Sequence, residues 1–180
     1  MSISVSGLFR AVQEGGMTKM EVQTKHFGLM QYTEEETVHF QDGLFGFENY
    51  QNYLPIPVEQ DSDAIICLQS LDDADIAFII MNPFLLSPTY DPRISDADRK
   101  ALGNPKDEDI SYYCICVLQD TLEESSINLK CPIAVNALTR AARQLILEQP
   151  EYDFRHQMKD ISKTRERKVN IQLNKNYKKL

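Results

Sequence analysis

Two almost continuous apolar runs of strand length constrain the fold of this chain most strongly. They occupy residues 64–69 and 76–81, and the acidic stretch 71–75 separates them. Apolar runs of this length, bounded by turn residues, are typical of strands buried on both faces. A third run, residues 110–118, is rich in aromatic and β-branched residues, which favour strands. We therefore predict a mostly β domain in which these three segments are central strands.

Shorter segments complete the predicted sheet. Residues 22–32 alternate around a turn at residues 25–28, as a β-hairpin does. Residues 53–58 contain two prolines, which suits an edge strand. Further short strands are expected at residues 37–40, 127–129 and 133–135.

Helical signals are brief. Ser95 precedes a turn with two acidic residues and Gly103 follows it, which predicts a short capped helix. Residues 82–94 contain three prolines, so we expect neither a strand nor a helix there, but a crossing over the surface. Residues 139–147 fit either a helix or a turn followed by a closing strand, and we adopt the turn and strand.

A chain of 180 residues with 42% hydrophobic residues can form one core without disulfides or metal. We divide it into an N-terminal extension (residues 1–19), a β domain (20–154) and a basic C-terminal extension (155–180). Residues 2–16 lack the charged start and continuous apolar run of a signal peptide, and no apolar stretch reaches the roughly 18 residues that a membrane helix needs, so we expect a cytoplasmic protein with no membrane partner. Four cysteines in apolar surroundings indicate reduced, buried thiols; they are Cys67, Cys114, Cys116 and Cys131.

Charge is distributed unevenly along the chain. Residues 1–154 contain 25 acidic and 10 basic residues, a net charge of −15, whereas residues 155–180 contain 2 acidic and 9 basic residues, a net charge of +7. Phosphate backbones are bound by Lys and Arg, so we expect the body not to bind nucleic acid directly and to attract basic proteins instead. The basic extension is either a solubilising end or a separate RNA-binding segment.

Enzyme motifs are absent from the sequence. It has no phosphate-binding glycine loop, no nucleophile elbow and no paired histidines at helical spacing. Cys114 and Cys116 lie within a strand-like run rather than in the turn-borne pairs of structural zinc sites, so core packing is the better interpretation. We expect no catalytic residue, no metal and no cofactor. The alternative hypothesis is a carboxylate-dependent enzyme, because acidic turns recur along the chain.

Aromatic residues in glycine-bearing or proline-bearing connections need a separate explanation. Phe45 and Phe47 lie between the expected strands at 37–40 and 53–58. They either fold back to plug one end of the sheet or form an exposed apolar docking patch. The same choice applies to the connection that carries Phe84 and Tyr90.

Between residues 21 and about 155 the chain resembles the FliW-type flagellar assembly factors. The motifs that carry the resemblance are, in order, VQTK at 22–25, FG at 27–28, Phe40, GLFGFE at 43–48, LQS at 68–70, AF at 77–78, NPF at 82–84, Tyr90, NLKCPIAVN at 128–136 and QLIL at 144–147. The chain departs from the family pattern at Phe45, where the family commonly has proline, and in its extended ends. Each motif is weak alone, but the ordered set is specific.

The resemblance implies a small antiparallel β-barrel-like single domain with one or two short helices. It also implies a cytoplasmic, non-enzymatic protein that binds flagellin and, when free of flagellin, binds and antagonises the translational regulator CsrA. We expect the acidic body to contact CsrA in a salt-sensitive way and aromatic residues to contact flagellin. The candidate partner-binding residues are Phe45, Phe47, Glu48, Pro83, Phe84, Tyr90, Asn128 and Asn136.

Overall fold

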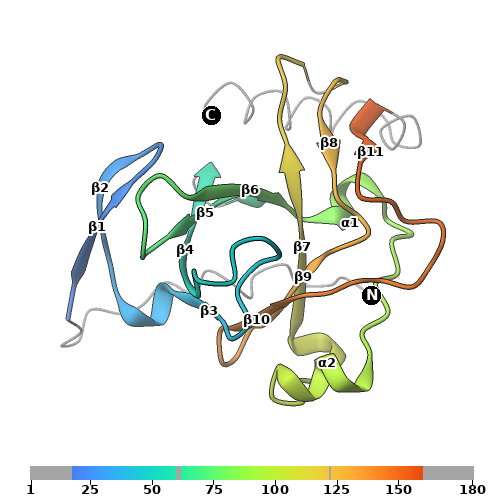
Figure 1. Cartoon of the computed structure of the whole chain (residues 1–180), viewed down its shortest axis with the longest axis horizontal. Helices are drawn as coiled ribbons and strands as arrows, with labels where there is room; N and C mark the ends of the chain where they lie inside the picture. Colours follow the sequence, from blue (N-terminus) through green and yellow to red (C-terminus); the bar gives the residue numbers. More distant parts are fainter. Residues whose placement is uncertain (1–17, 60–61, 122, 160–180) are drawn as a thin grey trace.

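In the computed structural model, which describes residues 18–59, 62–121 and 123–159, seven strands close into a small barrel (Figure 1). In hydrogen-bonded order these strands are β7 (Ile110–Val117), β6 (Ala77–Met81), β5 (Ser62–Ser70), β4 (Asn52–Glu59), β3 (Val38–Phe40), β10 (Ala141–Gln144) and β9 (Ile133–Asn136). The pairing of β9 with β7 completes the ring. The predicted mostly β, barrel-like fold is therefore confirmed.

One pairing in the ring departs from the antiparallel expectation. β3 and β10 run parallel, with Ala141 opposite His39 and Ala142 opposite Phe40. About 100 residues separate these strands in the sequence, so no local turn signal could indicate their direction. The parallel pair places the end of β3 and the end of β10 at the same mouth of the barrel.

The remaining elements lie around the barrel. β1 (Met20–Thr24) and β2 (Gly28–Tyr32) form the predicted hairpin, and β8 (Ser126–Ile127) pairs with β7 on one side and β11 (His156–Gln157) on the other. The two α-helices of the described residues are short, α1 (Pro83–Leu86) and α2 (Asp96–Ala101). Two single 3-10 turns span Glu34–Glu36 and Asp107–Asp109.

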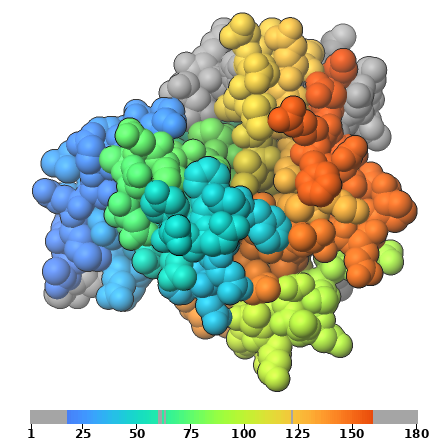
Figure 2. Space-filling model, in the orientation of Figure 1, coloured from blue at the N-terminus to red at the C-terminus, as the bar shows by residue number. Residues whose placement is uncertain are grey.

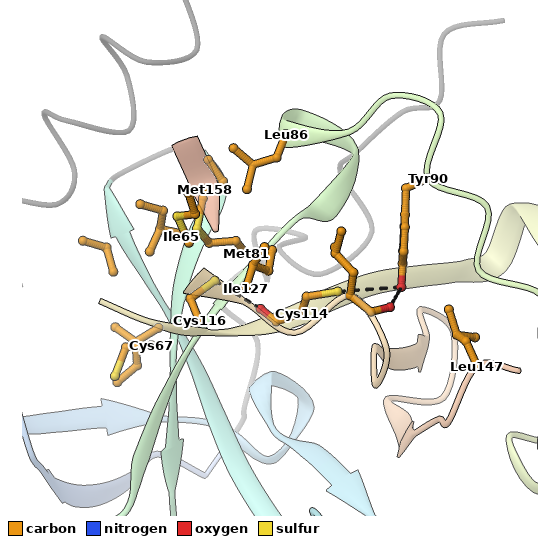
Figure 3. Close-up of a cluster of buried hydrophobic side chains, with 14 of the residues drawn as sticks. Ile65, Cys67, Met81, Leu86, Tyr90, Cys114, Cys116, Ile127, Leu147 and Met158 are labelled. Carbon is orange, nitrogen blue, oxygen red and sulfur yellow. Dashed lines mark hydrogen bonds between the residues drawn. The ribbon is translucent and has the colours of Figure 1, made fainter. Parts of the chain in front are cut away.

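Alternate residues of the barrel strands enter two different cores. All seven strands contribute to the internal cluster, which consists of Val38, Phe40, Leu44, Tyr53, Ile66, Leu68, Ile80, Tyr113, Ile133, Val135 and Ala142. On β5, the neighbouring residues Ile65 and Cys67 instead enter a second cluster on the outer face, which also contains Leu86 of α1 and Met158; Figure 3 shows Met158 beside Ile65. Strands buried on both faces have no polar face to alternate, which explains the continuous apolar runs of β5 and β6.

The proline-rich segment after β6 is more ordered than predicted. Pro83 begins α1, because a missing N–H costs nothing at the first helical position, and the Asn82 side chain accepts a hydrogen bond from the Phe84 N–H at 3.0 Å. Leu86 and Tyr90 are buried. The prediction of a surface crossing without a helix was therefore wrong for this part of the segment.

Residues 53–58 form a strand as predicted, but it is an internal strand of the ring rather than an edge strand. β4 lies between β3 and β5, but β3 pairs only with Asn52 and Tyr53. Pro55 and Pro57 lie beyond the end of β3, so neither is required to donate to that neighbour. The capped helix after Ser95 and the closing strand within residues 139–147 are confirmed as α2 and β10.

The packed body continues past residue 154. β11 pairs with β8, and Met158 is fully buried with its N–H bonded to the Ser125 carbonyl at 3.0 Å. The N-terminal extension apart from Thr18 and Lys19, and the basic extension from residue 160, lie outside the described residues. Among the residues that are described, no helix has the length and apolar character needed to cross a membrane.

A buried amide joins the hairpin to the barrel. Gln69 is fully buried on β5, and its Oε1 accepts a hydrogen bond from the Lys25 N–H at 2.8 Å. Its Nε2 lies 3.1–3.3 Å from the carbonyl oxygens of Ser70, Asp73, Ala74 and Ile76. One side chain thus fixes the turn between β1 and β2 and the acidic turn between β5 and β6.

We expect Gln69→Leu to lower the free energy of unfolding by about 2–3 kcal/mol, because several buried backbone groups lose their partner. Chemical denaturation measures the change. Gln31→Leu is the matched control, since Gln31 only reaches Glu21 on the exposed hairpin, and it should change stability by less than about 0.5 kcal/mol. Equal losses in the two variants would contradict this role of Gln69.

Candidate functional site

The connection between β3 and β4 covers one mouth of the barrel. In Figure 1 the barrel strands form a ring around this cyan segment, and in Figure 2 its atoms occupy the middle of the visible face. Leu44 is only 1% exposed and packs in the internal cluster. Phe45 and Phe47 are 49% and 36% exposed. Leu44 is therefore the plug, and the two phenylalanines lie on the surface.

Phe47 belongs to a group of aromatic rings at this mouth. Its ring packs edge to face against Phe78 of β6, with ring centres 4.9 Å apart, and lies 6.4 Å from Tyr50. Phe78 and Tyr50 are half-buried. Sequence reasoning missed both residues, because Phe78 lies within a run that reads as core and Tyr50 lies outside the glycine-bearing motif.

Residues of β10 hold the connection in place. The buried Gln144 side chain accepts a hydrogen bond from the Phe45 N–H at 2.9 Å through Oε1. The guanidinium of Arg143 forms ion pairs with Asp42 and, at 2.8 Å, with Asp98 of α2. The parallel alignment of β3 and β10 is what brings these side chains to the connection.

Tyr53 lies beneath the aromatic group. Its side chain is fully buried, and its ring contacts Phe40 and Phe78 with centres 5.3 and 6.2 Å away. The hydroxyl has no hydrogen-bond partner among the described residues. Burial, reinforced by the nearby charge of Asp72, raises the pKa of Tyr53 to about 12, so the hydroxyl stays protonated.

Carboxylates lie in the connection and in the neighbouring turn between β5 and β6. The backbone N–H of Gly46 donates to Glu48 Oε1 at 2.8 Å, and this bond, with that of Glu48's own N–H, lowers the pKa of Glu48. The turn between β5 and β6 carries Asp72, Asp73 and Asp75, with the Ser70 hydroxyl accepting from the N–H groups of the first two. Figure 2 shows this turn in green beside the cyan connection.

The second predicted aromatic set lies elsewhere and is largely internal. Pro83 and Tyr90 are buried, and the Tyr90 hydroxyl donates to the Leu129 carbonyl at 2.8 Å. Figure 3 shows the Tyr90 hydroxyl directed towards Cys114. Phe84 is half-buried, with its ring centre 5.8 Å from that of Tyr90. The structure does not bring this set together with Phe45 and Phe47.

The two predicted asparagines organise turns. Asn128 Oδ1 accepts from the Cys131 N–H at 2.9 Å. Asn136 is buried; its Nδ2 donates to the Leu102 carbonyl at 2.9 Å, and its Oδ1 accepts from the N–H groups of Leu138 and Thr139. Both side chains therefore form hydrogen bonds with backbone groups of the fold.

The four thiols are free and buried, as predicted. Burial raises the pKa of Cys67 to about 11 and that of Cys114 to about 12, and it raises the pKa values of Cys116 and Cys131 as well. The described part of the chain contains no group of three or more His, Cys, Asp or Glu side chains that could hold a metal ion.

Comparison with known proteins gives a consistent result. The profile of the FliW protein family matches residues 21–158. The flagellar assembly factor FliW of Lachnospira eligens is 35% identical over 150 residues, covering 82% of this chain and 99% of that protein. Its counterpart in Caldanaerobacter subterraneus subsp. tengcongensis is 34% identical over 137 residues, covering 76% and 91%. A crystal structure of the flagellar assembly factor FliW superposes with a TM-score of 0.72 at 27% identity, covering 77% of this chain and 96% of that chain.

In the native protein at pH 8, we expect a thiol-reactive reagent to modify none of the four cysteines rapidly, because the reactive thiolate is suppressed by burial. The unfolded protein should expose all four. Folding raises the Cys67 pKa from its ordinary 9.0 to about 11, because burial disfavours the thiolate. The free energy of unfolding should therefore fall as pH rises through this interval, where the unfolded protein loses the proton and the native protein keeps it. Rapid modification of a native thiol would contradict the buried assignment.

Gly43 and Gly46 form a matched pair for testing the connection. Both have left-handed φ angles, +69° and +82°, but a Cβ on Gly43 would lie 2.5 Å from the Glu48 Cα, whereas one on Gly46 would meet nothing within 4 Å. We expect Gly46→Ala to cost roughly 1–2 kcal/mol of stability and Gly43→Ala about 3 kcal/mol or more. Chemical denaturation of both variants checks this order, and the reverse order would show that the connection adopts another path.

Proposed function

This chain belongs to the FliW family of flagellar assembly factors, and on that premise we propose that it binds flagellin in the cytoplasm and, when free of flagellin, captures and antagonises the translational regulator CsrA. The observation that supports this most directly is the family match over residues 21–158, which contains the whole barrel and its plugged mouth. Competition between the two partners would link translation of flagellin to its export by mass action.

The surface of the body suits protein capture. Exposed Phe45 and Phe47 supply apolar contact area for a partner segment. The excess of carboxylates in residues 1–154 attracts a basic, RNA-binding regulator and repels RNA itself. Together they support partner binding by the body, without direct binding of nucleic acid by the body and without a membrane partner.

We propose that this function involves no catalysis and no cofactor. His39 Nδ1 lies 2.9 Å from the Asn52 Oδ1, while His156 Nε2 accepts from the Asp153 N–H at 2.7 Å, so these two histidines serve different local structures. The pKa of Glu48 at the mouth is lowered, whereas a carboxylic general acid requires a raised pKa. These features disfavour the rival of a carboxylate-dependent enzyme.

Displacement tests the proposal. We expect the protein to co-purify with flagellin of the same bacterium, to release CsrA when flagellin is in excess, and to relieve CsrA-dependent repression of a flagellin reporter in vitro. Size-exclusion chromatography with multi-angle light scattering would distinguish two binary complexes from one ternary complex. A stable complex that contains both partners would contradict the exclusive switch.

The RNA-binding rival of the basic extension requires a carefully chosen truncation. A chain that ends at Lys159 retains β11 and the buried Met158, whereas a chain that ends at residue 154 would lose both. If the chain that ends at Lys159 still binds both proteins, the body carries the function.

A further inference from the structure

We propose that the plugged mouth of the barrel is the docking surface for the basic partner, CsrA, and that the buried Tyr53 hydroxyl is held unpaired for a polar group of that partner. The inference rests on the proposed function and replaces, for Phe45 and Phe47, the expectation from the sequence that aromatic residues contact flagellin. The mouth surface is defined by the rings of Phe45, Phe47, Tyr50 and Phe78, by Glu48 in the same connection, and by Asp72, Asp73 and Asp75 in the adjacent turn between β5 and β6.

The apolar centre of the mouth surface is preorganised. Leu44 anchors the connection inside the barrel, and the Gln144 side chain fixes the Phe45 backbone at 2.9 Å. Arg143 holds Asp42 at the start of the same connection. A partner therefore meets exposed rings on a backbone that is already fixed, which reduces the ordering cost of binding.

The surrounding charge selects the kind of partner. Within the described residues, no ion pair engages Glu48, Asp72, Asp73 or Asp75, whereas Arg143 is already bound by Asp42 and Asp98. An apolar centre with unpaired carboxylates beside it complements a segment that presents an aliphatic side chain next to Lys or Arg. Of the two proposed partners, the RNA-binding regulator is the one that must carry such basic residues.

Tyr53 adds an observation that packing alone does not explain. A fully buried hydroxyl without a partner destabilises a fold by about 1–3 kcal/mol, yet phenylalanine would fill the same place between Phe40 and Phe78. The hydroxyl lies close enough to Asp72 for that charge to affect its ionisation. The Tyr53 ring contacts Phe78 of the mouth surface, so the hydroxyl lies below that surface, and a docked polar group becomes its partner only where docking moves the rings that now exclude solvent from it.

The second aromatic set lacks these properties. Tyr90 is buried and its hydroxyl is bonded to Leu129, and the nearby Asp91 is paired with Arg93. Phe84 is therefore a suitable comparison position: it is aromatic and half-buried, and its ring lies beside Tyr90 and Tyr112 rather than in the mouth surface.

Calorimetric titration of the full-length protein with CsrA, and separately with flagellin, tests the inference. We expect Phe47→Ala and Phe45→Ala each to weaken CsrA binding about tenfold or more. Asp72→Asn should weaken it about threefold at low salt and less at high salt. Leu138→Ala, at the opposite end of β10 and 74% exposed, and Asp120→Asn are the matched controls and should stay within about twofold of the wild type.

Tyr53→Phe separates the hydroxyl from the packing of the ring. The variant should keep or increase the free energy of unfolding, because an unpaired buried group is removed, while CsrA binding weakens about fivefold to tenfold. Lower stability with unchanged affinity would show that the hydroxyl is already satisfied within the fold, and would overturn its assigned role.

The outcomes distinguish the inference from the proposed function. If the wild-type protein binds neither CsrA nor flagellin, the proposed function fails. If it binds both and the mouth variants behave like the controls while Phe84→Ala weakens CsrA, the function stands and the docking surface is misplaced. If the mouth variants weaken flagellin and leave CsrA unchanged, the mouth binds the other partner and the charge argument is wrong.

Discussion

The closure of the sheet by β9 is the constraint on which the rest of this structure depends. β9 pairs with β10 on one side and with β7 on the other, so the ring has no free edge at this point. Closure encloses the alternate side chains of seven strands in one apolar interior. The opposite side chains of β5, β6 and β7 then need a cover of their own, which the hairpin, α1, β8 and the segment ending at Met158 provide.

A closed ring leaves two mouths, and one of them requires a plug because the interior is apolar. Leu44 supplies it, and tight turns at two glycines with left-handed φ angles return the chain to β4. Buried amides then join distant parts of the chain: Gln144 fixes this connection, and Gln69 fixes the hairpin and the acidic turn. Sealing the mouth and exposing Phe45 and Phe47 are thus two results of the same loop geometry.

The candidate site could be predicted only in part. The motif at residues 43–48 drew attention to the connection that covers the mouth, but it could not separate Leu44, which is buried, from Phe45 and Phe47, which are exposed. Tyr90, Asn128 and Asn136 were candidate binding residues in the sequence, but in the structure their side chains form hydrogen bonds within the fold. Phe78, Tyr53 and Asp72 join the site because β4, β5 and β6 are neighbours, and no local pattern records that arrangement.

The sequence by itself determined the central strands, the short capped helix, the buried thiols, the acidic body and the family to which the chain belongs, because these depend on local periodicity, composition and an ordered set of motifs. Only the tertiary structure decided that β3 and β10 run parallel, that Pro55 and Pro57 lie beyond the end of β3, and that Pro83 begins a helix. It also decided which aromatic rings reach the surface. Exposure and strand direction arise from pairings between residues far apart in the chain, and the free energy of such pairings depends on the whole closed barrel rather than on any segment of it.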